Sequence, residues 1–227
     1  MYFKALFMSN VTEPLDTLHD IKRMMERSSR FISLSGWSGI VAGICALIGA
    51  AAAHQRIVHY YHAEYKIVGG AIAELRYDLI LIAFLTFVSS FVLAMFFTFV
   101  RSKKEGVAIW GTAARRLMWN TSIPLIAGGF LIWRLIEISG YELVAPACLI
   151  FYGLALVNGS KYTMGEVRWL GYGEIILGII SLWITRHGIV FWALGFGVLH
   201  IIYGFAMWWK YERNDSREVF RQGVNAE

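Results

Sequence analysis

Residues 169–209 of the chain, WLGYGEIILGIISLWITRHGIVFWALGFGVLHIIYGFAMWW, decide its fold class. They form two apolar runs, 169–185 and 189–209, separated only by the polar turn Arg186-His187-Gly188. At about 1.5 Å per helical residue, each run is about long enough to cross a hydrocarbon layer of about 30 Å. The stretch therefore predicts two membrane-spanning helices that are joined as a hairpin.

The rest of the chain has the same character. Of its 227 residues 57% are hydrophobic and only 16% are charged, whereas about 25% are charged in a soluble domain. Four further apolar runs cover residues 31–53, 79–100, 117–138 and 143–157, of which the last is short for a bilayer. We therefore predict an all-α integral membrane protein with a six-helix transmembrane domain at 31–209, an N-terminal segment at 1–30 and a charged cytoplasmic tail at 210–227.

The N-terminal segment has an amphipathic pattern. Leu15, Leu18, Ile21 and Met25 recur at helical spacing, and charged residues occupy most positions between them. This pattern is typical of a helix that lies on the membrane surface with its Lys and Arg near anionic headgroups. The alternative is a docking helix for a cytoplasmic protein partner.

The positive charges predict how the chain is oriented. Most Lys and Arg residues lie in the N-terminal segment, the loops at 101–116 and 158–168, and the tail. By the positive-inside rule both termini are cytoplasmic and the number of spans is even. The net charge of +5 does not indicate nucleic-acid binding, because the basic residues fall on alternate loops between apolar runs.

The segment between the first two spans keeps a helical pattern. Ile57, Val58, Tyr61 and Tyr65 are spaced as on one helix, and Gly69-Gly70 interrupts the pattern. We therefore expect the first two helices to project beyond the outer interface as a hairpin.

Two histidines in this segment are candidate metal ligands. His59 and His62 share a helical face, as metal ligands often do, but no third ligand is fixed by the sequence. We therefore read them as exposed or interfacial histidines and predict no metal site.

Small residues mark one face of the first span. Ser35, Gly39 and Gly43 are spaced by four, and so are Ala42, Ala46 and Ala50. Such spacing lets helix backbones approach closely in lipid. Close packing inside the bundle is the first interpretation, and a homo-oligomer seam is the second.

Glu174 and His200 are the candidate ligand-binding residues within the C-terminal hairpin. Glu174 lies about 9 Å along its helix from Arg168, and His200 about 15 Å along the next helix from Lys210. The two side chains should therefore lie within about one helical turn in depth on neighbouring helices. Together they can share a proton or bind a small polar or cationic ligand; alternatively they form a buried pair that only fixes helix register.

A second ionisable pair, Arg134 and Glu137, lies near the end of the third run. The i, i+3 spacing lets the two side chains pair on one helix. They are included as candidate ligand-binding residues, with snorkelling of Arg134 to the interface as the alternative.

The sequence carries no recognisable catalytic or cofactor motif. It contains no Walker loop, no His-Glu-x-x-His, no Gly-x-Ser-x-Gly and no Cys pair, so we predict no cofactor and favour a non-enzymatic protein. The first interpretation is a non-enzymatic sensor or interaction component that works through its cytoplasmic surface helix and loops. The alternatives are a small carrier or channel for a polar or cationic solute or protons that uses Glu174 and His200, and then a haem-binding redox protein with His200 as axial ligand.

Two fragments resemble known proteins. DIKRMMERSSRFISLSG at 20–36, and NGSKYT at 158–163 with WLG at 169–171, resemble uncharacterised six-span inner-membrane proteins of Bacteroidota-type bacteria. The resemblance implies a location in a bacterial inner membrane. It implies no activity and no site residues.

Overall fold

A computed structural model describes residues 35–63, 71–105 and 110–213, which form only helices and the turns between them. Five helices come first: α2 (Gly36–Ala63), α3 (Ala71–Glu105), α4 (Thr112–Glu137), α5 (Val144–Gly159) and α6 (Glu166–Trp183). The sixth helix is continuous over residues 188–212 and is called the C-terminal helix below. It comprises α7 (Gly188–Trp192), the π-helical segment η4 (Ala193–Leu199), α8 (His200–Met207) and a second π-helical segment, η5 (Trp208–Glu212).

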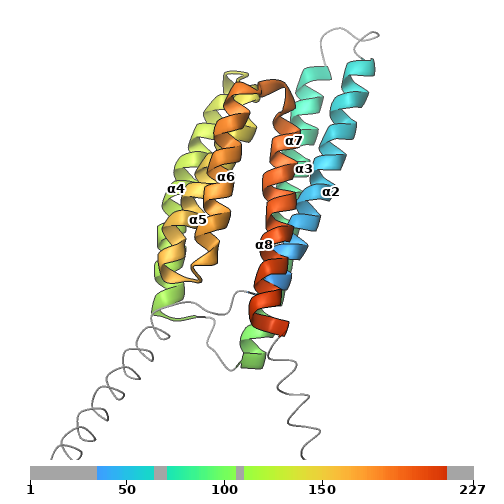
Figure 1. Cartoon of the computed structure of the whole chain (residues 1–227). Coiled ribbons are helices and arrows are strands. Elements are labelled where there is room, and N and C mark those ends of the chain that lie inside the picture. The colour runs from blue at the N-terminus through green and yellow to red at the C-terminus, as the bar shows by residue number, and fades with distance from the viewer. Residues whose placement is uncertain (1–34, 64–70, 106–109, 214–227) are drawn as a thin grey trace, which may run out of the picture.

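The helices form two groups of three that lie side by side (Figure 1). In one group α5 packs between α4 and α6, and in the other α2 packs between α3 and the C-terminal helix. The groups meet where the C-terminal helix contacts α5 and α6. Because apolar side chains cover much of the outer surface, including Phe84, Phe91 and Trp183, the bundle has the surface of a protein immersed in lipid.

Four helical segments are long and apolar enough to cross a membrane. They are Gly36–His62, Ala73–Lys104, Tyr141–Tyr162 and Thr185–Tyr211. The predicted run at 143–157 is thus part of a longer segment, because 3₁₀ turns at Tyr141–Leu143 and Ser160–Tyr162 extend α5 at both ends. The chain is a multi-span helical membrane protein by this measure.

The helices α4 and α6 are the two that do not pass the same test. α6 carries Glu166, Arg168 and Glu174 within 18 residues, and α4 carries Arg134 and Glu137 in its last turns. A membrane-spanning α4 or α6 must keep these charged side chains away from lipid. For α6, this requires Glu174 to face the inside of the bundle.

The first two helices extend well past their apolar runs, as the helical pattern predicts. α2 continues to Ala63 and α3 begins at Ala71, and an ion pair of 3.5 Å between Arg56 and Asp78 joins them near this end. The proposed break at Gly69-Gly70, the N-terminal amphipathic helix and the tail beyond residue 213 lie outside the described residues.

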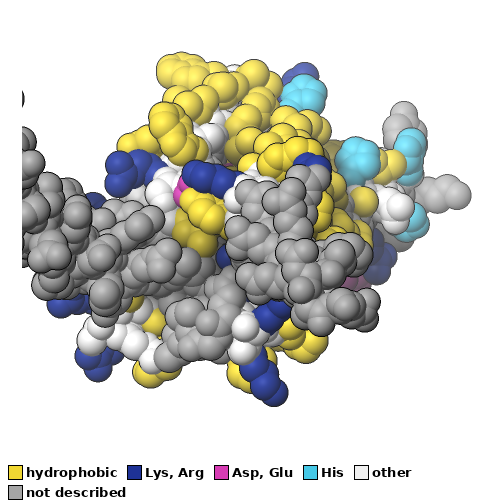
Figure 2. Space-filling model, turned by 60° about the horizontal axis from the view of Figure 1, so that its bottom comes forward, with side chains coloured by type: hydrophobic (Ala, Val, Ile, Leu, Met, Phe, Trp, Pro, Cys, Tyr) yellow, Lys and Arg dark blue, Asp and Glu magenta, His cyan; other side chains and the backbone are white. Residues whose placement is uncertain are grey.

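Basic side chains gather at the opposite end of the bundle, where α3 ends and α6 begins. Figure 2 shows Lys and Arg spaced around this end. Lys103, Lys104, Lys161 and Lys210 all lie in the last turns of their elements here. We refer to it as the basic end.

Glycines bring α2 and α8 close together. A Cβ atom on Gly36 would lie 2.5 Å from the Gly204 carbonyl oxygen, and one on Gly39 would lie 3.1 Å from the Gly204 Cα atom. A Cβ atom on Gly43 would likewise lie 2.6 Å from the Gly197 carbonyl oxygen of η4. The small-residue face of α2 is therefore used for packing inside the bundle, and a homo-oligomer seam remains a prediction.

Gly204→Ala is expected to destabilise the protein by about 1–3 kcal/mol, because the added methyl group overpacks a tight contact. Its Cβ atom would lie 2.5 Å from both the Gly36 carbonyl oxygen and the Ile40 backbone nitrogen. Both are backbone atoms, which cannot move aside as a flexible side chain could. The matched control is Gly129→Ala in α4, where no described atom lies within 4 Å of the new Cβ atom. Unfolding in mixed detergent micelles measures both, and equal stabilities would contradict the contact.

Candidate functional site

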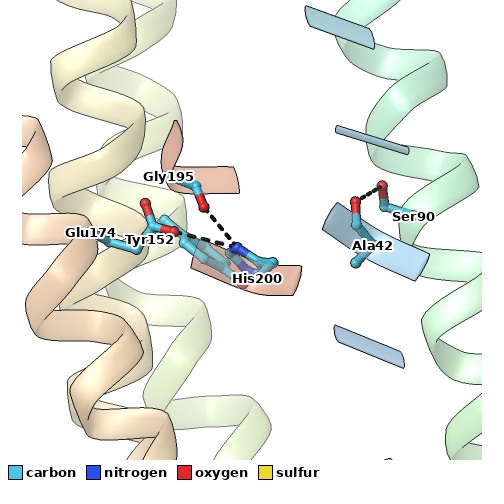
Figure 3. A network of polar contacts seen from close by, with 6 residues as sticks. All are labelled: Ala42, Ser90, Tyr152, Glu174, Gly195 and His200. Carbon is cyan, nitrogen blue, oxygen red and sulfur yellow. Dashed lines mark hydrogen bonds and ion pairs between the residues drawn. The ribbon is translucent and has the colours of Figure 1, made fainter. Parts of the chain in front are cut away.

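The C-terminal hairpin brings Glu174 and His200 together inside the bundle, and the predicted proximity of these two residues is confirmed. Glu174 is on α6 and His200 begins α8, and the Glu174 Oε1 atom lies 3.4 Å from the His200 Nδ1 atom. His200 is 6% exposed and Glu174 is 0% exposed. Figure 3 shows Glu174, Tyr152 and Gly195 converging on the His200 ring, with the Ser90–Ala42 contact between α2 and α3 well apart.

Both ring nitrogens of His200 have partners. The Nδ1 atom lies 3.1 Å from the Gly195 carbonyl oxygen, and the Nε2 atom lies 2.8 Å from the Tyr152 hydroxyl. A carbonyl oxygen only accepts, so Nδ1 carries a hydrogen and donates it to Gly195. In the neutral ring Nε2 is then the acceptor, and the Tyr152 hydroxyl donates to it.

The local helix geometry explains why the Gly195 carbonyl is available. Gly195 precedes His200 by five residues and lies in the π-helical segment η4, where backbone bonds run over five residues instead of four. The imidazole, which follows the segment directly, bonds back over the same interval. Single-turn π segments are frequent at functional sites.

Aromatic rings hold the imidazole in place. The Tyr152 ring centroid lies 5.0 Å from that of Phe196 and 5.4 Å from that of His200, and Phe196 stacks on His200 at 6.1 Å. Contacts of this kind add to the orientation that the two hydrogen bonds set. His200 is therefore fixed from α5 and from its own helix.

Glu174 has far fewer polar contacts than His200. Its two carboxyl oxygens are buried and have no hydrogen-bond partner among the described residues, and the nearby His200 Nδ1 atom is directed to Gly195 instead. Room for the carboxyl group depends on Gly195, since a Cβ atom there would lie 2.5 Å from Glu174 Oε2. A buried carboxyl group without a donor is costly, and this marks Glu174 as the unusual residue of the site.

The other candidate residues do not join this cluster. Arg134 and Glu137 pair with each other at 3.1 Å on α4, as predicted, but both side chains are more than half exposed. His59 and His62 are exposed on α2. Within the described residues no group of three His, Cys, Asp or Glu side chains could hold a metal ion.

A second polar contact joins α6 and the C-terminal helix at the basic end. Lys210 donates to the Glu166 Oε1 atom, and the Tyr211 hydroxyl donates to that atom at 2.8 Å. Glu166 lies in the first turn of α6, before its apolar part. Burial alone would raise the pKa of Glu166, but the hydrogen bonds from Lys210 and Tyr211 outweigh it and hold that pKa below its ordinary value of 4.5.

This contact is expected to stabilise the protein above about pH 4.5 and to be lost as the pH falls through the lowered pKa of Glu166. A group with a depressed folded-state pKa binds its proton more readily when unfolded, so acid favours unfolding. The melting temperature of Glu166→Gln should lie below that of the wild type at neutral pH and converge with it in acid. Glu74→Gln, at an exposed position of α3, is the control and should show no such convergence.

No family model, curated protein or solved structure matches the chain. The geometry is therefore the basis for any functional assignment. Sequence reasoning missed Tyr152 and the Gly195 carbonyl, because one is a tyrosine in an apolar run and the other is a backbone group. The ionisable character of Glu174 and His200 was the signal that found the site.

Proposed function

We propose that the chain is a six-span membrane protein that carries a small cationic solute or protons through the site formed by Glu174, His200 and Tyr152. The observation that carries this proposal is the buried Glu174 carboxyl group, whose oxygens have no hydrogen-bond donor among the described residues. A carboxyl group in such a place is expensive, and ionisable groups inside membrane helices typically serve ion or substrate pathways.

The packing of α6 supports a crossing helix. Glu174 faces α5 and the C-terminal helix and is 0% exposed, so lipid does not meet its charge. The exposed side chains of Trp169 and Trp183 lie near the two ends of α6, where aromatic residues mark membrane interfaces. With α6 and α4 added to the four apolar segments, the bundle has six spans, and the basic end then faces the cytoplasm.

The geometry favours a carrier over a haem protein. Both His200 nitrogens are engaged by Gly195 and Tyr152, so axial ligation would require one of these hydrogen bonds to break. The sensor or interaction hypothesis relies on the cytoplasmic surface helix and loops, and the surface helix lies outside the described residues. It stays a prediction, as does the location in a bacterial inner membrane.

The test is cation entry into proteoliposomes that contain the full chain. An inside-negative potassium diffusion potential drives entry, and the three probes are protons, sodium and choline. At least one probe should enter wild-type vesicles faster than vesicles with Glu174→Gln, while Glu142→Gln, an exposed carboxylate outside the site, should behave as wild type. Equal entry of every probe in wild-type and Glu174→Gln vesicles would overturn the proposal. Melting curves of each variant exclude misfolding, and Tyr152→Phe tests the same site if Glu174→Gln does not fold.

A further inference from the structure

The buried polar side-chain atoms without a hydrogen-bond partner all belong to one pair of helices. Among the described residues they are the two Glu174 carboxyl oxygens, the Ser181 hydroxyl and the Tyr203 hydroxyl. All four lie on α6 or the C-terminal helix, which face each other. Buried polar atoms normally have hydrogen-bond partners, so several without a partner on one pair of helices need a physical explanation.

The spacing along α6 places its polar groups on one face. Glu166, Glu174 and Ser181 are separated by eight and seven residues, which is about two helical turns in each case. Ser181 is 0% exposed and lies about 10 Å beyond Glu174, toward the end of α6 opposite the basic end. This face therefore carries the Glu166 carboxyl group near one end, the Ser181 hydroxyl near the other, and the Glu174 carboxyl group between them.

Tyr203 extends the line from the site toward the basic end. It follows His200 by about one helical turn on α8, on the side that leads toward the basic end. Further along the same helix, Lys210 and Tyr211 donate hydrogen bonds to Glu166 at the basic end. Polar groups therefore continue from Glu166, through Tyr203 and Tyr152, to His200 and Glu174.

We propose that these groups form a proton path along the interface of α6 and the C-terminal helix, with Tyr203 on one side of the site and Ser181 on the other. The inference rests on the proposed function and names its substrate as the proton. Buried hydroxyl and carboxyl oxygens of this kind bind ordered water, which bridges groups too far apart for direct hydrogen bonds.

The packing favours a proton over a larger cation. Glu174 and its neighbour Leu149 are both 0% exposed, and the Glu174 Oε2 atom lies so close to Gly195 that a single methyl group there would meet it at 2.5 Å. A solute cation needs space beside the carboxylate for itself and for several oxygen ligands, whereas a proton binds to the oxygen itself.

The transfer can be written with its protons balanced. Tyr152 accepts a proton on its oxygen from the Tyr203 side as it gives its own proton to His200 Nε2. His200 then releases its Nδ1 proton to Glu174 Oε1, 3.4 Å away. Tyr152 and His200 end neutral, and Glu174 holds the proton. The imidazole is left with its hydrogen on Nε2, and loss of that proton to ordered water with gain of another on Nδ1 resets the ring for the next transfer.

Proton flux into proteoliposomes, read by a pH-sensitive dye inside them, tests the path. Ser181→Ala and Tyr203→Phe each remove one oxygen and are expected to lower the flux at least tenfold, which is about 1.4 kcal/mol in barrier height. Matched controls are Ser89→Ala, whose exposed hydroxyl bonds to its own helix at Thr86, and Tyr172→Phe on the exposed face of α6. Both controls should keep wild-type flux, and sodium and choline should not enter.

The outcomes separate this inference from the proposed function. Wild-type proton flux in both Ser181→Ala and Tyr203→Phe, with loss in Glu174→Gln, would refute the path and leave the carrier site standing. Entry of sodium or choline without protons would refute the proton as substrate. No entry of any probe would refute both proposals. The removed oxygens have no protein partner among the described residues, so folding should be kept; if one variant misfolds, the other tests its half of the path.

Discussion

Replacing Glu174 with Met and His200 with Phe together is expected to cost less free energy of unfolding than the two single replacements summed. Each single replacement removes the 3.4 Å contact between the two groups, so the loss of that contact is counted in both single variants but only once in the double variant. The loss of the Tyr152 hydrogen bond occurs in both the His200 single and the double variant, so it cancels in the cycle.

Unfolding of the four proteins in mixed detergent micelles measures the coupling. A parallel cycle with Arg134→Met and Glu137→Met serves as control, because that pair is exposed and should show little coupling. Additive effects of Glu174→Met and His200→Phe would mean that the 3.4 Å contact between the two groups contributes nothing to stability.

Gly195→Ala is expected to impair both stability and cation flux, although it adds only one methyl group. The new Cβ atom would meet the Leu149 side chain and lie 2.5 Å from the Glu174 Oε2 atom. Overpacking of this kind typically costs about 1–3 kcal/mol. The shift also moves the Glu174 carboxyl group away from His200, so flux should fall further than in a variant of equal stability.

The comparison variant is Gly188→Ala at the start of the same helix. There the new Cβ atom would lie 3.3 Å from the Ala145 Cβ atom, which is a mild contact far from the site. Flux in proteoliposomes and unfolding in micelles are measured for both. If Gly195→Ala keeps the flux of Gly188→Ala, the position of the Glu174 carboxyl group does not matter for transport.

Much of the fold was predictable because the lipid environment restricts the chain to helices. Apolar length and the short turn at Arg186-His187-Gly188 predict the hairpin, and the helical rise places Glu174 and His200 at similar depths. The partners of each helix were not predictable. The Gly39 and Gly43 spacing indicates a close contact, but nothing in it shows that α8 and η4 provide the other side.

The site was predictable only in part, for a related reason. An ionisable residue in an apolar run is conspicuous, so Glu174 and His200 could be found. Tyr152 could not, because α5 belongs to another part of the chain and tyrosine is ordinary in a membrane helix. A serine hydroxyl usually bonds back to its own helix, and only the structure shows that the Ser181 and Tyr203 hydroxyls have no partner among the described residues.

The π-helical segment η4 has a consequence for comparing this chain with others. An α-helix turns about 100° per residue, and a π turn holds one residue more than an α turn. Removing one residue from 193–199 would let the segment wind as an ordinary α-helix and keep the flanking residues on their faces. In a distant relative with the same bundle, a single-residue gap here is thus the least disruptive length change in the C-terminal helix. An alignment without a gap in this region would be shifted by one residue. It would pair His200 with the wrong residue of the relative and miss the residue that occupies the same position in the fold.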